Sequence, residues 1–307
     1  MSEPSMSESF KSGVISLVGR PNVGKSTLIN HLVGEKVAIV SAKPQTTRTL
    51  IRGVVTHEEG QMVFIDTPGI HKPRYLLSEQ IVAQAMYALN EVDWHLFLVD
   101  GTQAPGKGDE FVAKALGDQA KRTFLLLNKM DRLPKAERTR HLEAYQALGD
   151  FARCFMISAK HNTGLEGLTE EMLTVLPPGP MMYPEDEYTD QTTAAIAAEL
   201  IREQVFRQTG DEIPHASSVY IEQFKERSEK LTYIAAVVVV ERPGQKSIVI
   251  GKGGKKLKEI GSAARKSLES FLDKKVFLEL FVKVIPKWRN ERHRLRQLGY
   301  DELISKK

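Results

Sequence analysis

Short apolar runs alternate with amphipathic stretches through the first 176 residues. The apolar runs, which are typical of buried strands, cover residues 14–18, 64–65, 96–99, 124–127 and 155–157. The stretches with helical spacing cover residues 25–33, 78–90, 108–116, 135–148 and 165–176. Strands that alternate with helices predict a mostly parallel sheet with helices on both faces. We therefore expect an α/β domain over residues 11–178, after a polar, disordered N-terminus at 1–10.

The pattern changes after the prolines at 177, 178 and 180. A polar, acidic stretch follows, and we interpret residues 179–191 as a linker. Beyond it the pattern predicts a helix over 192–208, strands over 217–224, 232–240 and 276–284, and a helix over 255–272. Residues 192–307 therefore form a second, smaller α+β domain, with a basic amphipathic tail at 287–298.

Bulk composition is that of an ordinary globular protein, with 41% hydrophobic and 27% charged residues. No apolar run approaches the roughly 20 residues that a membrane-spanning helix needs, and the N-terminus has no apolar signal core. Cys154 is the single cysteine, so we expect a buried thiol without a disulfide partner. The expectation is a cytoplasmic protein, and a monomer.

Charge is distributed unevenly. Residues 1–180 hold 20 basic and 20 acidic residues, and residues 181–241 hold 5 basic and 12 acidic ones. In contrast, residues 242–296 hold 16 basic and 5 acidic residues. A basic block beside neutral and acidic ones indicates a polyanionic partner for that block.

Residues 19–26 match the phosphate-binding pattern G-x-x-x-x-G-K-[ST] between a predicted strand and a predicted helix. Backbone N–H groups and a helix N-terminus would hold a triphosphate there. The candidate phosphate-binding residues are Asn22, Val23, Gly24, Lys25, Ser26 and Thr27.

A second motif, Asp-Thr-Pro-Gly at 66–69, follows another predicted strand. Asp66 would hold the shell of a Mg²⁺ ion, and the Gly69 N–H would contact the γ-phosphate. We expect the Ser26 hydroxyl to ligate Mg²⁺ and a threonine from the polar segment 41–49 to complete the metal shell. We favour Thr47 over Thr46. Lys25, Thr47, Asp66 and Gly69 are thus the candidate catalytic residues.

Two later motifs, Asn-Lys-Met-Asp at 128–131 and Ser-Ala-Lys at 158–160, also follow predicted strands. A carboxylate accepts hydrogen bonds from N1–H and N2–H₂ of guanine, which adenine cannot offer, so Asp131 would select GTP or GDP. The Asn128 amide and the Ala159 N–H would serve the base and its O6, and lysine stems would cover the ring. The candidate guanine-binding residues are Asn128, Lys129, Asp131, Ser158, Ala159 and Lys160.

Ile70 stands where GTPases of the Ras type have a water-orienting glutamine. We therefore expect slow intrinsic GTP hydrolysis. Asn22 is a candidate ligand for a K⁺ ion that would act in place of an arginine finger.

A G-x-x-G motif lies within the basic block, at Gly251–Gly254. It follows an apolar stretch at 247–250 that predicts a strand end, and a basic helix follows it. This order is typical of a K-homology (KH) clamp, which holds about four unpaired nucleotides. The candidate RNA-binding residues are Ile250, Gly251, Lys252, Gly253, Gly254, Lys255 and Lys258. The tail allows two interpretations. Trp288 contacts a base or a membrane surface, or it is buried on its own domain.

Taken together, these motifs and the Pro-Gln-Thr-Thr-Arg segment at 44–48 resemble the Era family of bacterial ribosome-assembly GTPases over nearly the whole chain. The resemblance implies a P-loop GTPase domain followed by a type II KH domain. It also implies binding of the single-stranded 3′ end of 16S rRNA, a 30S ribosomal partner, and peripheral association with the inner face of the cell membrane. GTP would favour the RNA-competent arrangement. The alternatives are an RNA-binding module with a structural nucleotide and a membrane-associated signalling GTPase.

Overall fold

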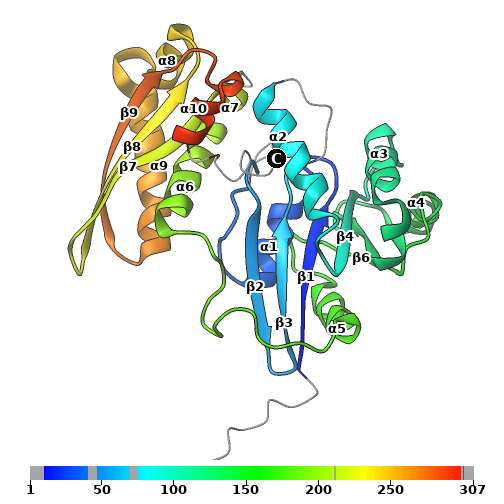
Figure 1. The fold of residues 1–307 in the computed structure, drawn as a ribbon. Helices are drawn as coiled ribbons and strands as arrows, with labels where there is room; N and C mark the ends of the chain where they lie inside the picture. The colour runs from blue at the N-terminus through cyan, green and yellow to red at the C-terminus, as the bar shows by residue number, and fades with distance from the viewer. Residues whose placement is uncertain (1–9, 41–46, 70–74, 211, 299, 301–307) are drawn as a thin grey trace, which may run out of the picture. The chain divides into compact units, whose positions relative to one another are not determined.

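The computed structural model describes residues 10–40, 47–69, 75–210, 212–298 and 300. The chain forms two compact units (Figure 1). The described part of unit 1 covers residues 10–38, 47–69 and 82–190, and that of unit 2 covers residues 39–40, 75–81 and the residues from 191 onward. The N-terminus predicted to be disordered lies outside the described residues, apart from Phe10.

Unit 1 is built on a six-stranded sheet in the order β2-β3-β1-β4-β5-β6. The strands are β1 (Lys11–Val18), β2 (Ile51–His57), β3 (Gly60–Asp66), β4 (Trp94–Asp100), β5 (Thr123–Asn128) and β6 (Arg153–Met156). All neighbouring strands are parallel except β2 and β3, which form an antiparallel hairpin. The predicted, mostly parallel sheet is confirmed, but the sequence analysis missed the edge strand β2.

Helices cover both faces of this sheet, as expected. They are α1 (Lys25–Val33), α2 (Leu76–Ala88), α3 (Lys107–Leu116), the 3₁₀ turn η1 (Gly117–Arg122), α4 (Lys135–Gln146) and α5 (Leu165–Val175). Leu28 of α1 and Leu168 of α5 pack in one core with Ile15 and Leu96. Val112 of α3 and Tyr145 of α4 pack in the other core, against the opposite face of the strands.

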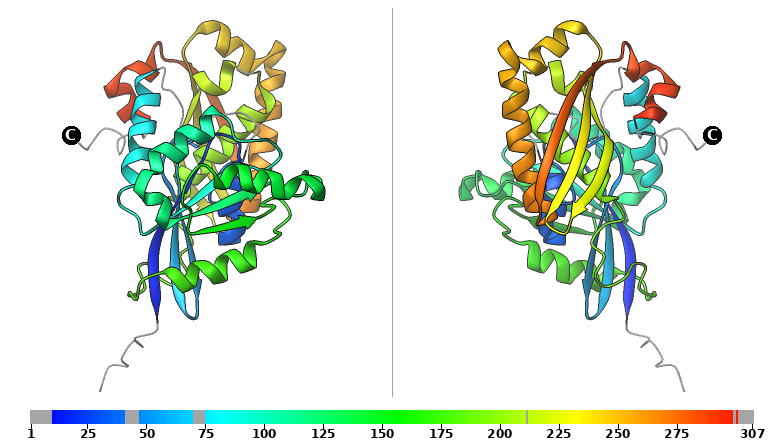
Figure 2. Two further views of the ribbon diagram at one scale, coloured as in Figure 1. Left: turned by 90° about the vertical axis from the view of Figure 1, so that its right-hand side faces the viewer. Right: turned by 90° about the vertical axis from the view of Figure 1, so that its left-hand side faces the viewer.

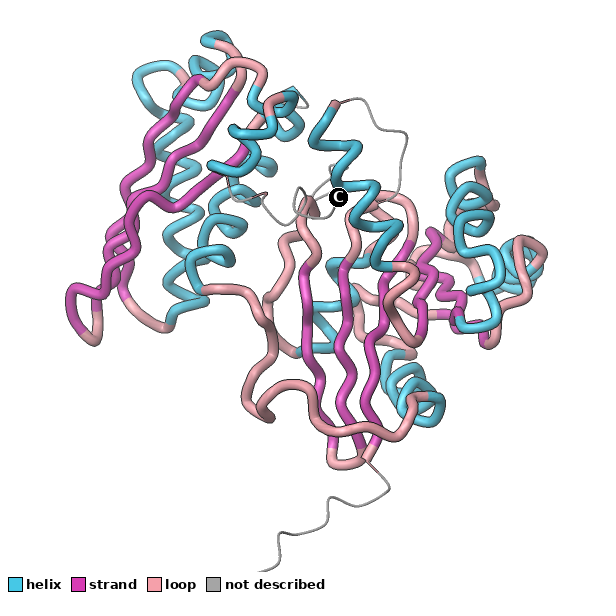
Figure 3. The backbone as a smooth tube through the Cα atoms, in the orientation of Figure 1, coloured by secondary structure: helices cyan, strands magenta, loops and turns pink. Residues whose placement is uncertain are grey.

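Unit 2 contains a three-stranded sheet in the order β7-β8-β9 (Figure 3). Its elements are α6 (Thr193–Gln208), α7 (Glu212–Ala216), β7 (Ser218–Ser228), β8 (Leu231–Val240), α8 (Pro243–Ile250), η2 (Lys252–Gly254), α9 (Lys255–Leu272), β9 (Lys275–Val284), η3 (Trp288–Asn290) and α10 (Arg292–Gln297). Strand β8 is antiparallel to β7 and parallel to β9. This α+β domain is the one that the sequence predicts, with one correction: the stretch before the G-x-x-G motif is the helix α8 and not a strand end.

The two faces of the small sheet are covered differently. Alternate residues of β8, such as Ile234 and Val238, pack in a core with Leu200 of α6 and Ile260 of α9. On the opposite face Val237 and Val239 pack against Trp288 and Leu295. Trp288 has no exposed surface, and its Nε1 donates to the Ala216 carbonyl at 3.1 Å. Of the two alternatives for Trp288, the structure therefore shows burial on its own domain.

The segment predicted as a linker packs along β2 and β3 within unit 1. The side chain of Gln61, which has no exposed surface, accepts from the N–H groups of Met182 and Tyr183 and donates to the Tyr183 carbonyl. Tyr188 O accepts from the backbone of β2, and Asp190 forms an ion pair at 2.6 Å with Arg52. Residues 182–190 are thus held by the first unit, and the division between the units falls after Asp190.

Cys154 differs from the sequence expectation. Its thiol is only partly buried, on the short strand β6, and Sγ accepts from Gln146 Nε2 at 3.3 Å. β6 is an edge strand with a neighbour on one side only, and the apolar run around Cys154 did not reveal that position in the sheet.

Candidate functional site

The phosphate loop connects the end of β1 to the start of α1 in a conformation that requires glycine. Gly24 caps α1 with φ 111°, and a Cβ at this position would lie 2.2 Å from Asn128 Nδ2. Any larger residue would therefore clash as well as strain the backbone. Val23 is buried beneath the loop, while Asn22 and Thr27 lie nearer the surface. The N-terminus of α1 thus points its N–H groups toward the loop, as anion binding requires.

Three oxygen-bearing side chains meet beside Lys25, at the carboxyl end of β3. Ser26 Oγ donates to Asp66 Oδ2 at 2.7 Å, Thr47 Oγ1 donates to the same oxygen at 3.2 Å, and the two hydroxyls lie 3.1 Å apart. These are the three residues that the sequence predicts as the Mg²⁺ set. The alternative, Thr46, lies outside the described residues.

This cluster fits a hard divalent cation. Its donors are all oxygens, which Mg²⁺ prefers. Asp66 is fully buried, and its Oδ1 has no hydrogen-bond partner among the described residues. An unpaired buried carboxylate oxygen is costly, so it indicates a ligand. Burial raises the pKa of Asp66, and the charge of Lys25 opposes that rise.

Lys25 is itself buried, and its Nζ donates to the carbonyls of Gly19 and Arg20, each at 3.1 Å. Burial lowers the pKa of this ammonium, and the nearby Asp66 carboxylate acts in the opposite direction. Gly69 packs next to the loop, since a Cβ there would lie 2.9 Å from the Pro21 nitrogen. The four candidate catalytic residues are therefore gathered around one loop.

The side chain of Asn128 ties three loops together. Its Nδ2 donates to the Val23 carbonyl at 2.8 Å, and its Oδ1 accepts from the N–H groups of Lys129 and Ala159 at 2.8 and 2.9 Å. The sequence analysis assigned the Asn128 amide and the Ala159 N–H to the base. In the structure the two groups also bond to each other, so Asn128 holds the loops at 128–131 and 158–160 against the phosphate loop, and their contact with the base stays a prediction.

Asp131 presents a carboxylate at the surface of this site. Its Oδ1 accepts from Ser158 Oγ at 2.6 Å, and that hydrogen bond lowers the pKa of Asp131. The group is therefore ionised at neutral pH, as hydrogen bonding to guanine requires. His161 Nε2 lies 3.7 Å from Asp131 Oδ2, a neighbour that the sequence analysis did not identify. Lys160 is exposed on the same loop.

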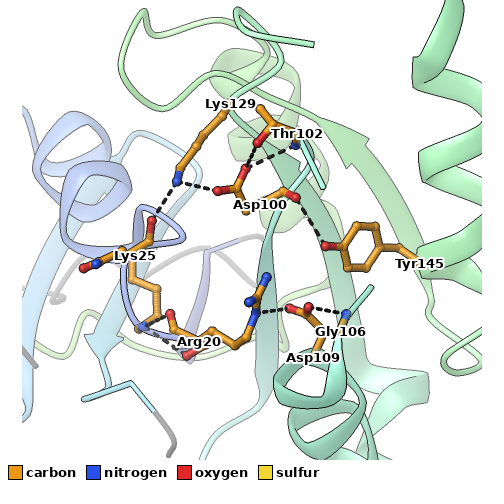
Figure 4. A network of polar contacts seen from close by, with 10 residues as sticks. Arg20, Lys25, Asp100, Thr102, Gly106, Asp109, Lys129 and Tyr145 are labelled. Atoms are coloured by element: carbon orange, nitrogen blue, oxygen red, sulfur yellow. Dashed lines mark hydrogen bonds and ion pairs between the residues drawn. The ribbon is translucent and has the colours of Figure 1, made fainter. Parts of the chain in front are cut away.

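A polar network joins the base-reading loop to the phosphate loop (Figure 4). Lys129 Nζ donates to the Asn22 carbonyl at 2.8 Å and to Asp100 Oδ2 at 2.7 Å. Burial alone would raise the pKa of Asp100, but the hydrogen bonds from Lys129 and Thr102 bring it below its ordinary value.

On the other side of the loop, Arg20 pairs with the buried Asp109 of α3 at 2.7 Å, and Asp109 also accepts from the Gly106 N–H at 3.0 Å. The sequence analysis missed this pair, because nothing in the spacing of residues 20 and 109 signals their proximity.

In unit 2 the G-x-x-G motif forms a tight turn between α8 and α9. Gly251 has φ 73° and ψ 174°, and a Cβ there would lie 2.6 Å from Lys256 Cβ. Lys252 and Lys255 are exposed around the turn, and Ile250 is half-buried at the end of α8. The turn also carries Gly253 and the α9 cap residue Gly254, both with positive φ.

A cleft of about 420 Å³ extends from this turn between α9 and β9. Its lining combines an apolar floor with two cations from α9. The lining residues are Gly254, Leu257, Lys258, Gly261, Ser262, Arg265, Val276, Phe277, Leu278 and Leu280. Of the predicted RNA-binding residues, Gly254 and Lys258 line the cleft itself, and the others form the turn at its end or flank it. Arg265 and the β9 residues were missed, although the amphipathic pattern of α9 contains the signal for Arg265.

No helix in the described part of the chain is long and apolar enough to cross a membrane. Within the same residues no three His, Cys, Asp or Glu side chains cluster as a metal site.

Comparisons with known proteins match both units. Residues 14–129 match the family model described as a 50S ribosome-binding GTPase, and residues 212–289 match that of a KH domain. The GTPase Era of Ruminiclostridium cellulolyticum is 47% identical over 95% of this chain and 98% of its own.

Two solved structures are similar throughout. One is Era in complex with MgGDPNP and nucleotides 1506–1542 of 16S ribosomal RNA, with a TM-score of 0.91 and 36% identity over 95% of this chain and 99% of that one. The other is a point variant of Aquifex aeolicus Era bound to GDP·AlF₄⁻, with a TM-score of 0.90 and 36% identity over 94% of this chain and 99% of that one.

Proposed function

The chain belongs to the Era family of GTPases, and from that membership we propose that it binds the single-stranded 3′ end of 16S rRNA under the control of GTP and assists assembly of the 30S subunit. The observation that carries this proposal is the presence, in one chain, of a GTP site in unit 1 and a basic cleft at a G-x-x-G turn in unit 2. The similar Era structure holds MgGDPNP and nucleotides 1506–1542 of 16S ribosomal RNA.

Each predicted residue of the GTP site has a task that its position allows. Lys25 supplies a positive charge at the loop that binds phosphate, and Ser26, Thr47 and Asp66 would hold Mg²⁺. A bound Mg²⁺ would neutralise charge on the phosphate oxygens during phosphoryl transfer. Asp131 selects the base, and Asn128 fixes the loop that carries it.

The cleft in unit 2 is suited to an unpaired strand. Leu257, Leu278 and Leu280 offer apolar contact to bases, while Lys258 and Arg265 can pair with phosphates. The glycine turn lets a sugar–phosphate backbone approach closely, in the manner of KH domains.

A titration of labelled 16S 3′-end RNA against the chain bound to GDP or to a non-hydrolysable GTP analogue tests the proposal. We expect tighter binding with the GTP analogue. The double variant Gly253→Asp, Gly254→Asp should abolish RNA binding and leave GTP hydrolysis unchanged. The control Gly244→Asp has open space around it and should bind normally. The unaltered chain could bind RNA with equal affinity in both nucleotide states, and Lys25→Ala could bind RNA with that same affinity. This result would reject nucleotide control and favour an RNA-binding module with a structural nucleotide.

Three further expectations belong to this proposal. Asn22 in the phosphate loop supports a role for K⁺ in hydrolysis, which equal turnover in KCl and NaCl would exclude. A cytoplasmic monomer with peripheral membrane contact is supported by the composition and by the exposed Arg292 and Arg296 of α10. Sedimentation of the chain with and without anionic vesicles tests both the monomer and the membrane contact.

A further inference from the structure

The outer face of the small sheet, opposite α6 and α9, is only partly covered. At one end of β8, Val237 and Val239 are buried under Trp288 and Leu295. Toward the other side of the face, the edge strand β9 leaves Phe277 and Phe281 half-exposed, at 51% and 50%. The strands that carry this face lie toward the viewer in the right-hand view of Figure 2. Single exposed apolar side chains are common, but exposed apolar side chains that lie together on one surface indicate a binding role.

The rings near Phe277 are held in a fixed arrangement. Phe277 stacks on Tyr233 of the neighbouring strand, with 6.0 Å between ring centroids and an interplanar angle of 23°. The Arg227 guanidinium lies 4.5 Å from the Tyr233 centroid and 5.9 Å from that of Phe277. The Tyr233 hydroxyl donates to the Glu279 carboxylate. The aromatic surface is therefore preorganised and would not have to form on binding.

Strand register places these side chains on one face. Lys225, Tyr233 and Phe277 are directly opposite one another across β7, β8 and β9, and Phe281 follows Phe277 by four residues on the same face. At about 3.3 Å per residue, the two phenylalanines are roughly 13 Å apart. They are thus two separate stacking positions. We define Tyr233, Phe277 and Phe281 as the aromatic platform.

We propose that the aromatic platform stacks unpaired bases of the same RNA strand that occupies the cleft. This inference rests on the proposed function and extends it to a second contact surface. Phe277 supplies the continuity, because it lines the cleft and also belongs to the platform. A strand that leaves the cleft over the free edge of β9 would reach the platform next.

Charge on this face favours RNA over a protein segment. Arg227, Lys225, Lys275 and Lys283 are exposed around the rings. Of the nearby carboxylates, Glu279 accepts from Tyr233 and raises the pKa of that hydroxyl, and Glu226 pairs with Lys274 at 3.0 Å. The exposed Glu222 lies close enough to Tyr233 to contribute to its raised pKa, so the cations around the rings outnumber the carboxylates by one. Stacking of bases on aromatic rings flanked by cations is the usual way to hold a single strand without regard to its sequence.

The test compares two single-stranded RNAs: one of about four nucleotides, which fills only a KH cleft, and one of about twelve, which lies within the range of extended single-strand sites. Phe281→Leu keeps an apolar side chain and lies outside the cleft lining. It should weaken binding of the longer RNA about tenfold, since loss of one stacked base lowers affinity by about fivefold to a hundredfold. Binding of the shorter RNA should not change.

The dependence of affinity on salt should also stay the same, because no phosphate contact is removed. Phe111→Leu, which alters an equally exposed phenylalanine on α3, is the matched control and should behave as the unaltered chain does.

The outcomes separate the two proposals. If the unaltered chain binds neither RNA, the proposed function fails and this inference fails with it. If both RNAs bind but Phe281→Leu has full affinity for the longer one, the cleft stands and the platform is refuted as an RNA surface, which leaves it to a protein partner. Circular dichroism of each variant confirms that the sheet has formed.

Discussion

Burial determines the pKa and the hydrogen bonding of single side chains in the GTP site. Asp66 has no exposed surface and one oxygen without a partner among the described residues, while two hydroxyls donate to its other oxygen. Such a carboxylate is stable only when a cation or another donor balances it.

We therefore predict that Asp66→Asn raises the Mg²⁺ concentration needed for half-maximal GTP hydrolysis by about 10- to 100-fold, as loss of a supporting carboxylate does at other metal sites. The measurement is GTP turnover over a Mg²⁺ titration. Asp118→Asn, on the exposed turn η1, should leave the curve unshifted. An unshifted curve for Asp66→Asn would contradict the metal assignment.

Asp131 determines which base is bound. Asp131→Asn turns an acceptor into a donor, so it should favour xanthine, which has a carbonyl where guanine has the N2 amino group. We expect the ratio of GTP to XTP affinity to fall by on the order of 10⁴. Competition of the two nucleotides for a fluorescent GDP measures the ratio, and Asp150→Asn is a surface control. An unchanged ratio would move base selection to another residue.

A buried histidine should make stability depend on pH. His95 is fully buried beside Ser16, and burial lowers its pKa to about 4. Between that value and the ordinary pKa of about 6.5, the unfolded chain binds more protons than the folded one, so stability decreases as pH falls. From pH 7 to pH 5 this histidine should cost about 2 kcal/mol.

Urea unfolding at both pH values measures this loss in the free energy of unfolding. His95→Gln should remove it, whereas His57→Gln, on an exposed position of β2, should retain it. Identical pH dependence in the His95 variant and the unaltered chain would show that His95 is not the cause.

At the scale of elements, the sequence predicts best where a motif follows an apolar run. Each front-half motif lies at the carboxyl end of its strand, as parallel sheets require. The error at α8 has a physical origin, because Ile248, Val249 and Ile250 favour strands locally. Stronger signals were present: Pro243 occupies the first helical turn, and the Gln245 side chain accepts from the N–H groups of Glu241 and Arg242.

The turn between α8 and α9 should tolerate no side chain at Gly251. Gly251→Ala meets a close contact and a backbone conformation nearly restricted to glycine, so it should destabilise unit 2 by about 1–3 kcal/mol. Thermal unfolding with RNA binding on the same samples measures the effect. Gly244→Ala lies within α8 in open space and should be neutral or stabilising. Equal stability of the two variants would contradict the strained turn.

At the scale of the whole molecule, composition and motif order predicted two domains and their chemistry. The contacts among distant loops were not predictable, because Asn128 reaching Val23 and Arg20 reaching Asp109 depend on how the strands assemble. The docking of residues 182–190 was missed for the same reason: a polar, acidic stretch was interpreted as a linker, and only the fold shows that Gln61 binds it.

Loss of that anchor should release the segment. Gln61→Leu removes the partners of two N–H groups and one carbonyl, each costing about 1–3 kcal/mol if left buried and unpaired. The segment should therefore detach and become sensitive to proteases. Limited proteolysis followed by mass spectrometry locates the cuts, and Gln103→Leu on an exposed turn is the control. Cuts that do not change would show that Gln61 is dispensable for docking.

The ion pair of Asp190 with Arg52 lies two residues before Thr192, whose hydroxyl caps α6 at 3.2 Å. Asp190 is the last residue of the docked segment and Gln191 already belongs to unit 2, so the cap of α6 follows the docked segment almost directly. Glycines inserted after Gln191 would lengthen the chain between Asp190 and Thr192 and leave the ion pair and the helix cap in place.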